Sequence, residues 1–94
     1  MSDRATIALT QLLAHARPNK AGAVLYRQGW VHLAYCCAWS YRADVPWAEF
    51  KETGPYWRVK RALDELTKAK RVELWEGARN GLGSVYRVIP PDER

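Results

Sequence analysis

Cationic, polar and aromatic side chains gather in the last third of the chain, and their chemistry is that of binding anions. The whole chain has 94 residues and a net charge of +5. A positive field favours encounters with polyanions, so nucleic acid, an anionic membrane and an acidic protein are the natural partners. Charge alone does not choose among these three. The residues concerned are Tyr56, Trp57, Arg58, Lys60, Arg61, Arg79, Asn80 and Ser84.

A second set of reactive side chains predicts neither a catalytic site nor a metal site. His32 and Cys36 are four residues apart and could share a helix face with metal-ligand spacing. A structural zinc site normally takes four ligands, however, and only Cys37 and the distant His15 remain to complete it. Nothing marks an oxyanion site or a third group that would orient a Cys–His pair. We therefore expect small buried cysteines and a hydrogen-bonded histidine, with no catalytic residue, metal or cofactor.

The length and composition of the chain favour a small binding protein over an enzyme. A chain of this length forms one compact domain, which leaves little room for a deep substrate cleft beside its core. No segment approaches the roughly 20 apolar residues of a membrane span, and polar residues interrupt the amino terminus where a secretory signal would lie. The neighbouring Cys36 and Cys37 cannot join distant segments of one chain by a disulfide. These features predict a soluble, cytoplasmic protein that does not bind membranes.

The first half of the chain is predicted to contain two helices with an ambiguous segment between them. In residues 3–17, apolar side chains recur at spacings of three and four, which is typical of one face of an amphipathic helix. Ser2 or Asp3 can cap this helix. Residues 30–42 are predicted to form a largely buried helix. Residues 23–30 between the two are compatible with a β-hairpin or with helix.

Two more helices are predicted in the middle of the chain. Asp44 can accept a hydrogen bond from an unpaired backbone amide, and it precedes a short helix at residues 47–52. Gly54 and Pro55 then break the chain and open the longest helical pattern, residues 56–70. The predicted inner face of this last helix holds Val59, Ala62, Leu63 and Leu66, and its outer face pairs Arg61 with Glu65, four residues on.

The end of the chain is predicted to form an antiparallel hairpin. Val72–Trp75 and Val85–Ile89 have strand-like composition, and residues 77–83 between them contain three glycines. Pro90 and Pro91 end the second strand, because proline cannot donate to the hydrogen-bond ladder.

Residues 30–89 together resemble the winged helix-turn-helix superfamily of bacterial, plasmid and phage regulators and replication proteins. Three segments carry the resemblance: the short helix and turn at Pro46–Gly54, the helix holding Val59–Leu66, and the hairpin end Gly83–Val88. The resemblance implies an α+β, mostly α fold, with a three-helix core and a carboxy-terminal β-hairpin wing. The whole chain, residues 1–94, would be one such domain, with residues 3–17 as an extra amino-terminal helix.

The resemblance also implies sequence-specific binding of double-stranded DNA, with the recognition helix 55–70 in the major groove. Arg58 and Arg61 would read bases, because a guanidinium can donate two parallel hydrogen bonds to guanine. Lys60 is better suited to phosphate, and Tyr56 and Trp57 complete the predicted surface of the helix.

The wing at residues 77–83 would contact the minor groove or the backbone. Arg79 could enter the groove or pair with phosphate, and Asn80 and Ser84 could add hydrogen bonds to phosphate. A small transcriptional or replication regulator would act in this way, without a cofactor.

A second function stays open because the recognition helix begins with Pro55, Tyr56 and Trp57, where many such helices have small polar residues. A winged helix with this aromatic surface could instead be a protein-interaction module that binds an acidic partner, such as an inhibitor of a nucleic-acid machine. The apolar face of helix 3–17 must also be buried somewhere, which favours a homodimer through the amino-terminal part. The remaining tryptophans, Trp30, Trp39, Trp47 and Trp75, lie in apolar stretches and are expected in the core.

Overall fold

The computed structural model of the chain describes residues 1–77 and 84–90, which form four helices and one four-stranded antiparallel sheet. The fold is α+β, as predicted. Among these residues, no helix combines the length and the apolar character that crossing a membrane requires. The elements are α1 (Asp3–His15), β1 (Arg17–Pro18), β2 (Val24–Tyr26), α2 (Gly29–Cys36), α3 (Trp47–Phe50), α4 (Gly54–Lys68), β3 (Val72–Glu76) and β4 (Val85–Val88).

Helix α1 confirms the predicted amino-terminal helix. It begins at Asp3, as predicted, and ends at His15, two residues before the predicted end. The Ser2 hydroxyl caps it by accepting a hydrogen bond of 3.1 Å from the amide of Ala5. After His15 the backbone becomes extended, and the guanidinium of Arg17 donates to the carbonyl oxygens of Ala14 and Ala16 at 3.1 and 2.8 Å. These donors satisfy carbonyls that a helix end otherwise leaves unpaired.

Residues 17–26 form a hairpin that the sequence leaves ambiguous. Asn19 organises its turn, because its side-chain oxygen accepts from the amides of Ala21 and Ala23 at 3.0 and 2.9 Å. Gly22 has a φ of 87°, a left-handed conformation that glycine adopts without a steric penalty. The ambiguous residues 23–30 therefore divide into strand β2 and the first turn of α2.

The predicted hairpin at the end of the chain is confirmed, and it belongs to a larger sheet. Strands β3 and β4 pair antiparallel, with Val72 opposite Val88 and a register shift between Leu74 and Glu76. Strand β4 also pairs with β2, so the order in the sheet is β1-β2-β4-β3. Strand β2, which directly precedes α2, thus connects the β3–β4 hairpin to the helices.

Helix α2 is shorter than predicted, because it ends at Cys36 and does not reach Arg42. Ala38 adopts a left-handed φ of 61° directly after the helix. The amide of Trp39 then donates to the carbonyl of Ala34 at 2.9 Å, and the amide of Ala38 donates to that of Tyr35 at 3.0 Å. This pattern is a Schellman motif, which normally has glycine where Ala38 stands.

The prediction that Asp44 caps the next helix is wrong. Pro46 occupies the cap position of α3, and the carbonyl of Pro46 accepts from the amide of Phe50 at 2.9 Å. The carboxylate of Asp44 lies outside the helix and accepts instead from Arg42 at 3.1 Å. Helix α3 is also shorter than the predicted 47–52, ending at Phe50.

Helix α4 begins with Gly54 and Pro55, and it ends two residues before the predicted Lys70. Lys70 has a φ of 57° and closes the helix in the same way as Ala38 closes α2. The predicted pairing of Glu65 with Arg61 is replaced, because Glu65 accepts a 2.7 Å hydrogen bond from the backbone amide of Ser2. That contact lowers the pKa of Glu65 and joins α4 to the start of α1.

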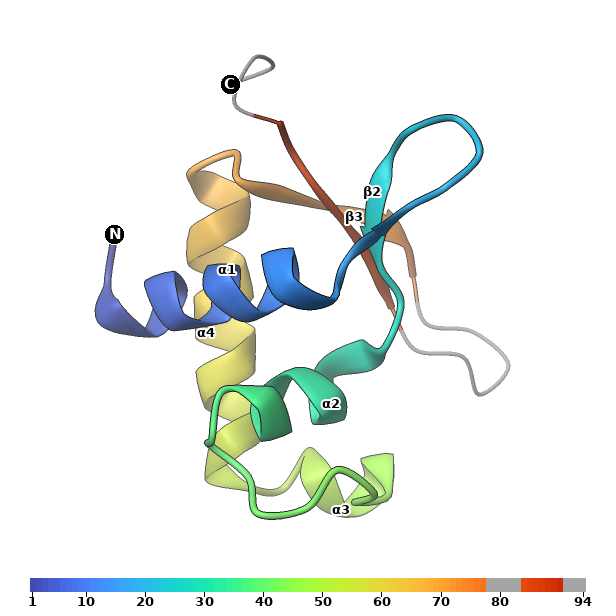
Figure 1. Cartoon of the computed structure of the whole chain (residues 1–94). Coiled ribbons are helices and arrows are strands. Elements are labelled where there is room, and N and C mark those ends of the chain that lie inside the picture. The colour runs from blue at the N-terminus through green and yellow to red at the C-terminus, as the bar shows by residue number, and fades with distance from the viewer. Residues whose placement is uncertain (78–83, 91–94) are drawn as a thin grey trace.

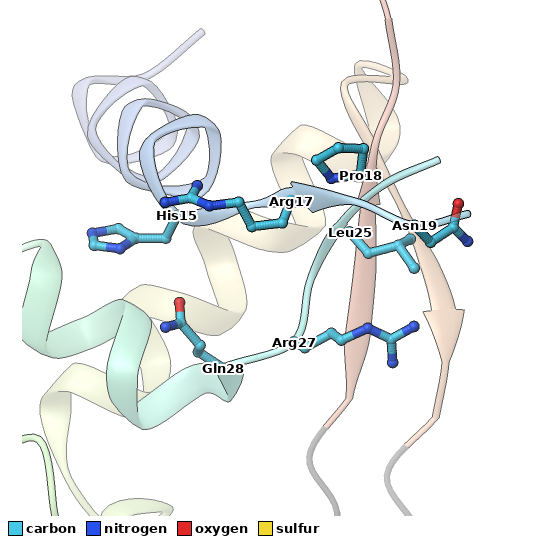
Figure 2. Close-up of a pocket in the computed structure, with 7 residues that line it drawn as sticks. All are labelled: His15, Arg17, Pro18, Asn19, Leu25, Arg27 and Gln28. Carbon is cyan, nitrogen blue, oxygen red and sulfur yellow. The ribbon is translucent and has the colours of Figure 1, made fainter. Parts of the chain in front are cut away.

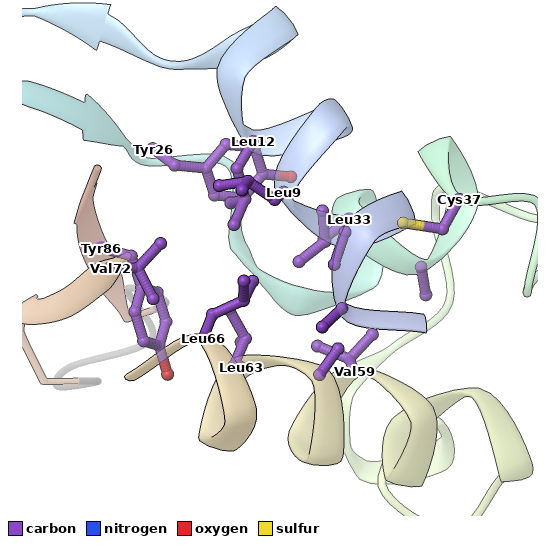
Figure 3. Packing of buried hydrophobic residues seen from close by; sticks show 14 of the residues in the cluster. Leu9, Leu12, Tyr26, Leu33, Cys37, Val59, Leu63, Leu66, Val72 and Tyr86 are labelled. Carbon is purple, nitrogen blue, oxygen red and sulfur yellow. The ribbon is translucent and has the colours of Figure 1, made fainter. Parts of the chain in front are cut away.

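The core lies where α1, α2, α4 and the sheet meet. Figure 1 shows α1 lying across α4, with α2 and α3 near the amino-terminal end of α4 and the sheet beside the helices. Figure 3 shows side chains from α1, α2, α4 and the sheet converging between these elements. The predicted inner face of α4 is buried there with the apolar face of α1, which holds Ala5, Ala8, Leu9 and Leu12. These four positions are thus covered within one chain, whereas Ile7 and Leu13 of the same helix are exposed, and the homodimer stays a prediction.

Replacing Ala38 with glycine should stabilise the protein. A left-handed conformation costs an L-residue about 1 kcal/mol that glycine does not lose. We expect Ala38→Gly to raise the free energy of unfolding in urea by about 0.5–1 kcal/mol. Ala14→Gly, at an exposed position inside α1, is the matched control and should lower it by about 1 kcal/mol. A loss of stability in Ala38→Gly would contradict the left-handed geometry.

Candidate nucleic-acid interface

The first half of α4 presents Trp57, Arg58 and Arg61 on the face opposite the core. Because the buried positions of this helix are Val59, Ala62, Leu63 and Leu66, its 3.6-residue period turns these three side chains outward. All three are exposed. Within residues 1–77 and 84–90, neither guanidinium has a hydrogen-bond or ion-pair partner. Both are therefore available to a ligand.

Lys60, predicted to contact phosphate, is paired inside the helix. Its ammonium donates to the carboxylate of Asp64 at 2.9 Å, and this hydrogen bond raises the pKa of Lys60. Both side chains are partly exposed, so the pair is at the surface. An acidic group on this face weakens the field that a phosphate would meet.

Tyr56 is the centre of an aromatic cluster. It is half-buried, and its ring lies 5.5 Å from that of Trp30, 5.8 Å from that of Trp47 and 6.2 Å from that of Phe50. Trp57 meets Tyr56 edge-on at 5.1 Å. These separations suit aromatic packing, so Tyr56 joins the amino-terminal end of α4 to α2 and α3.

Two of the tryptophans expected in the core are at the surface. Trp47 is 51% exposed and Trp75 is 44% exposed, whereas Trp30 and Trp39 are half-buried. Trp47 belongs to a helix of four residues in which only Phe50 is buried, so it covers the aromatic cluster from outside. With Trp57, which is 52% exposed, it gives this end of the molecule two accessible indole rings.

The hairpin is fixed to the helices next to the exposed face of α4. The indole nitrogen of Trp30 in α2 donates to the hydroxyl of Tyr86 in β4 at 3.3 Å. Tyr86 is itself buried, and burial raises the pKa of its hydroxyl. Ser84, predicted to contact phosphate, is half-buried directly before β4. Arg79 and Asn80, the other predicted wing contacts, lie outside the described residues.

Comparisons with known proteins add no assignment. The chain matches no protein-family model, no curated protein and no solved structure. The chemistry and the geometry of the residues on α4 and on the hairpin are therefore the basis for a proposed function.

A small cavity lies beside the first hairpin, among residues that the sequence did not single out. It has a volume of about 230 Å³. Figure 2 shows His15 and Gln28 on one side and Arg27 and Asn19 on the other. No local signal predicts this grouping, because it depends on the pairing of β1 with β2. The lining residues are His15, Arg17, Pro18, Asn19, Leu25, Arg27 and Gln28.

The structure brings the distant His15 next to His32 and Cys36. The sulfur of Cys36 lies 3.5 Å from Nε2 of His15 and 3.6 Å from Nε2 of His32. Burial, with a smaller effect of His15, lowers the pKa of His32, and burial raises the pKa of the Cys36 thiol. Both shifts favour the neutral form of the group. His32 is hydrogen-bonded to Tyr26 and Cys37 is buried, as expected, whereas Cys36 is only partly buried.

Proposed function

We propose that the protein binds double-stranded DNA as a winged helix, acting as a small transcriptional or replication regulator. One observation carries the proposal: Arg58 and Arg61 extend from the first half of a helix whose other face is the core, and neither has a partner in the part of the chain that the structure describes. A fixed helix with free guanidinium groups is suited to the major groove, which is about 12 Å wide and admits an α-helix.

The order and packing of the elements support the winged-helix part of the proposal. Helices α1, α2 and α4 contribute to one core, and the β3–β4 hairpin follows α4 directly. In this arrangement α1 is the first of the three core helices and not the extra helix expected from the sequence, and the short α3, expected as the second core helix, lies in the connection between α2 and α4. The wing would be the hairpin, held in place by the pairing of β4 with β2.

The spacing of the two arginines fits base reading. Three residues of helix rise by about 4.5 Å, which is close to the roughly 3.4 Å between successive base pairs. Arg58 and Arg61 would therefore reach neighbouring base pairs, each donating two hydrogen bonds to a guanine. Trp57, directly before Arg58, would pack on the sugar–phosphate backbone.

A second candidate function is supported by the exposed aromatic rings. Trp47 and Trp57 flank Tyr56, and both are about half exposed. Aromatic and arginine side chains are enriched in protein–protein interfaces. A protein-interaction module would use this surface to bind an acidic protein, and its function would not require DNA.

A salt titration of duplex binding tests the proposed function. Each neutralised phosphate makes the logarithm of the association constant fall by about 0.9 per tenfold rise in salt. We expect a slope near −2 or steeper for the purified protein, measured by fluorescence anisotropy on a pool of random duplexes. Absence of salt-sensitive duplex binding would reject the DNA proposal and favour the protein-interaction module. Preference for single-stranded or A-form competitors would indicate RNA as the ligand.

Removing either guanidinium should weaken binding and relax its sequence preference. We expect Arg58→Ala and Arg61→Ala each to lose about 1–3 kcal/mol on a selected site and less on random duplex. Lys20→Ala removes the same charge from the exposed β1–β2 turn and is the control for net charge. Equal losses in all three variants would show that the arginines do not read bases.

Neutralising Asp64 should tighten binding. Asp64→Asn removes the acidic partner of Lys60 and frees its ammonium for phosphate. We expect a higher affinity at low salt and a salt slope steeper by about 0.9, the value for one more phosphate. Asp3→Asn removes an exposed carboxylate from the first turn of α1 and should leave the slope unchanged. An unchanged slope in Asp64→Asn would place the duplex away from this face.

A further inference from the structure

Three side chains that ligate soft and borderline metals meet where the end of α1 lies against α2. His15 is the last residue of α1, and His32 and Cys36 lie four residues apart on α2. Their ligand atoms all lie within 4.8 Å of one another. All three side chains are partly buried, so solvent can still reach them.

The two sulfur–nitrogen separations in this cluster match those of zinc ligands. Zinc binds sulfur at about 2.3 Å and nitrogen at about 2.0 Å, and at a tetrahedral angle these bonds put sulfur and nitrogen about 3.5 Å apart. The sulfur of Cys36 lies 3.5 Å from Nε2 of His15 and 3.6 Å from Nε2 of His32. An ion could bind after the His32 ring turns to point Nε2 at it, because the sulfur of Cys36 lies almost as close to Nδ1, at 3.7 Å, as to Nε2.

Tyr26 orients His32 for this role. Its hydroxyl lies 3.2 Å from the carbonyl oxygen of Gly29 and 2.7 Å from Nδ1 of His32. When the hydroxyl donates to Gly29, its oxygen accepts from Nδ1, and Nε2 of His32, 3.6 Å from the sulfur of Cys36, keeps its lone pair for a metal. Metal-binding histidines are commonly fixed in this way by a second group.

We propose that His15, His32 and Cys36 bind a zinc ion through two nitrogens and one thiolate. The fourth position of the tetrahedron is then open to water or to another donor, as in zinc sites with three protein ligands. Binding releases the thiol proton of Cys36 to solvent and leaves both imidazoles neutral. Cys37 takes no part, because its side chain is buried in the core.

The proposal does not depend on DNA binding, and the test reads the metal directly. The full chain, kept reduced, is titrated with Co²⁺, which reports a thiolate ligand by a charge-transfer band in the near ultraviolet, and then with Zn²⁺ in competition. We expect one equivalent of Co²⁺ to give this band and Zn²⁺ to displace it. Zinc should also raise the melting temperature, because it binds the folded state.

Cys36→Ser should abolish the charge-transfer band, and the matched Cys37→Ser should keep it. His15→Gln, at the partly exposed end of α1, should lose the zinc-dependent rise in melting temperature while remaining folded by circular dichroism. Tyr26→Phe keeps the ring but removes the hydroxyl that orients His32, and it should weaken zinc binding by about 10- to 100-fold. No band in the wild-type protein, or a band that survives Cys36→Ser, would overturn the proposal.

Discussion

The structure depends on the burial of one face of α4. Val59, Ala62 and Leu66 are fully buried, and α4 packs against α1, α2 and the sheet. Burial of a valine or leucine side chain such as Val59 or Leu66 contributes on the order of 1.5–3 kcal/mol. Rotating the helix about its axis would expose these residues and bury Arg58 or Arg61 without partners, which is unfavourable. The core therefore fixes which side chains of α4 face a partner.

The elements that the sequence predicts well are those with strong local signals. Ser2 followed by a helical apolar period identifies α1, Pro55 in a first turn identifies α4, and two β-rich runs around glycines identify the β3–β4 hairpin. The end of α2 has no such signal, because Ala38 adopts a conformation that normally selects glycine. The two-residue strand β1 likewise exists only because β2 is beside it.

The candidate site was predictable to the extent that it follows helix periodicity. The outward positions of Arg58 and Arg61 follow directly from the inward positions of the apolar residues. The pairing of Lys60 with Asp64 was missed, although their spacing of four allows it. The exposure of Trp47 was also missed, because it depends on how α3 packs across the end of α4. The contact of His15 with Cys36 joins residues 21 apart, and only the packing of α1 against α2 produces it.

Helix α2 connects the two proposed sites, although it has only eight residues. One side of it carries Trp30, which packs on Tyr56 and donates to Tyr86, and so fixes α4 relative to the hairpin. Another side carries His32 and Cys36, which meet His15 at the end of α1. A zinc ion there would join the end of α1 to the second half of α2, which follows Trp30. Helix α2 would then position the proposed DNA-binding surface through Trp30, and the metal would hold the same helix through His32 and Cys36. The two proposed sites would thus depend on one helix but have no residue in common.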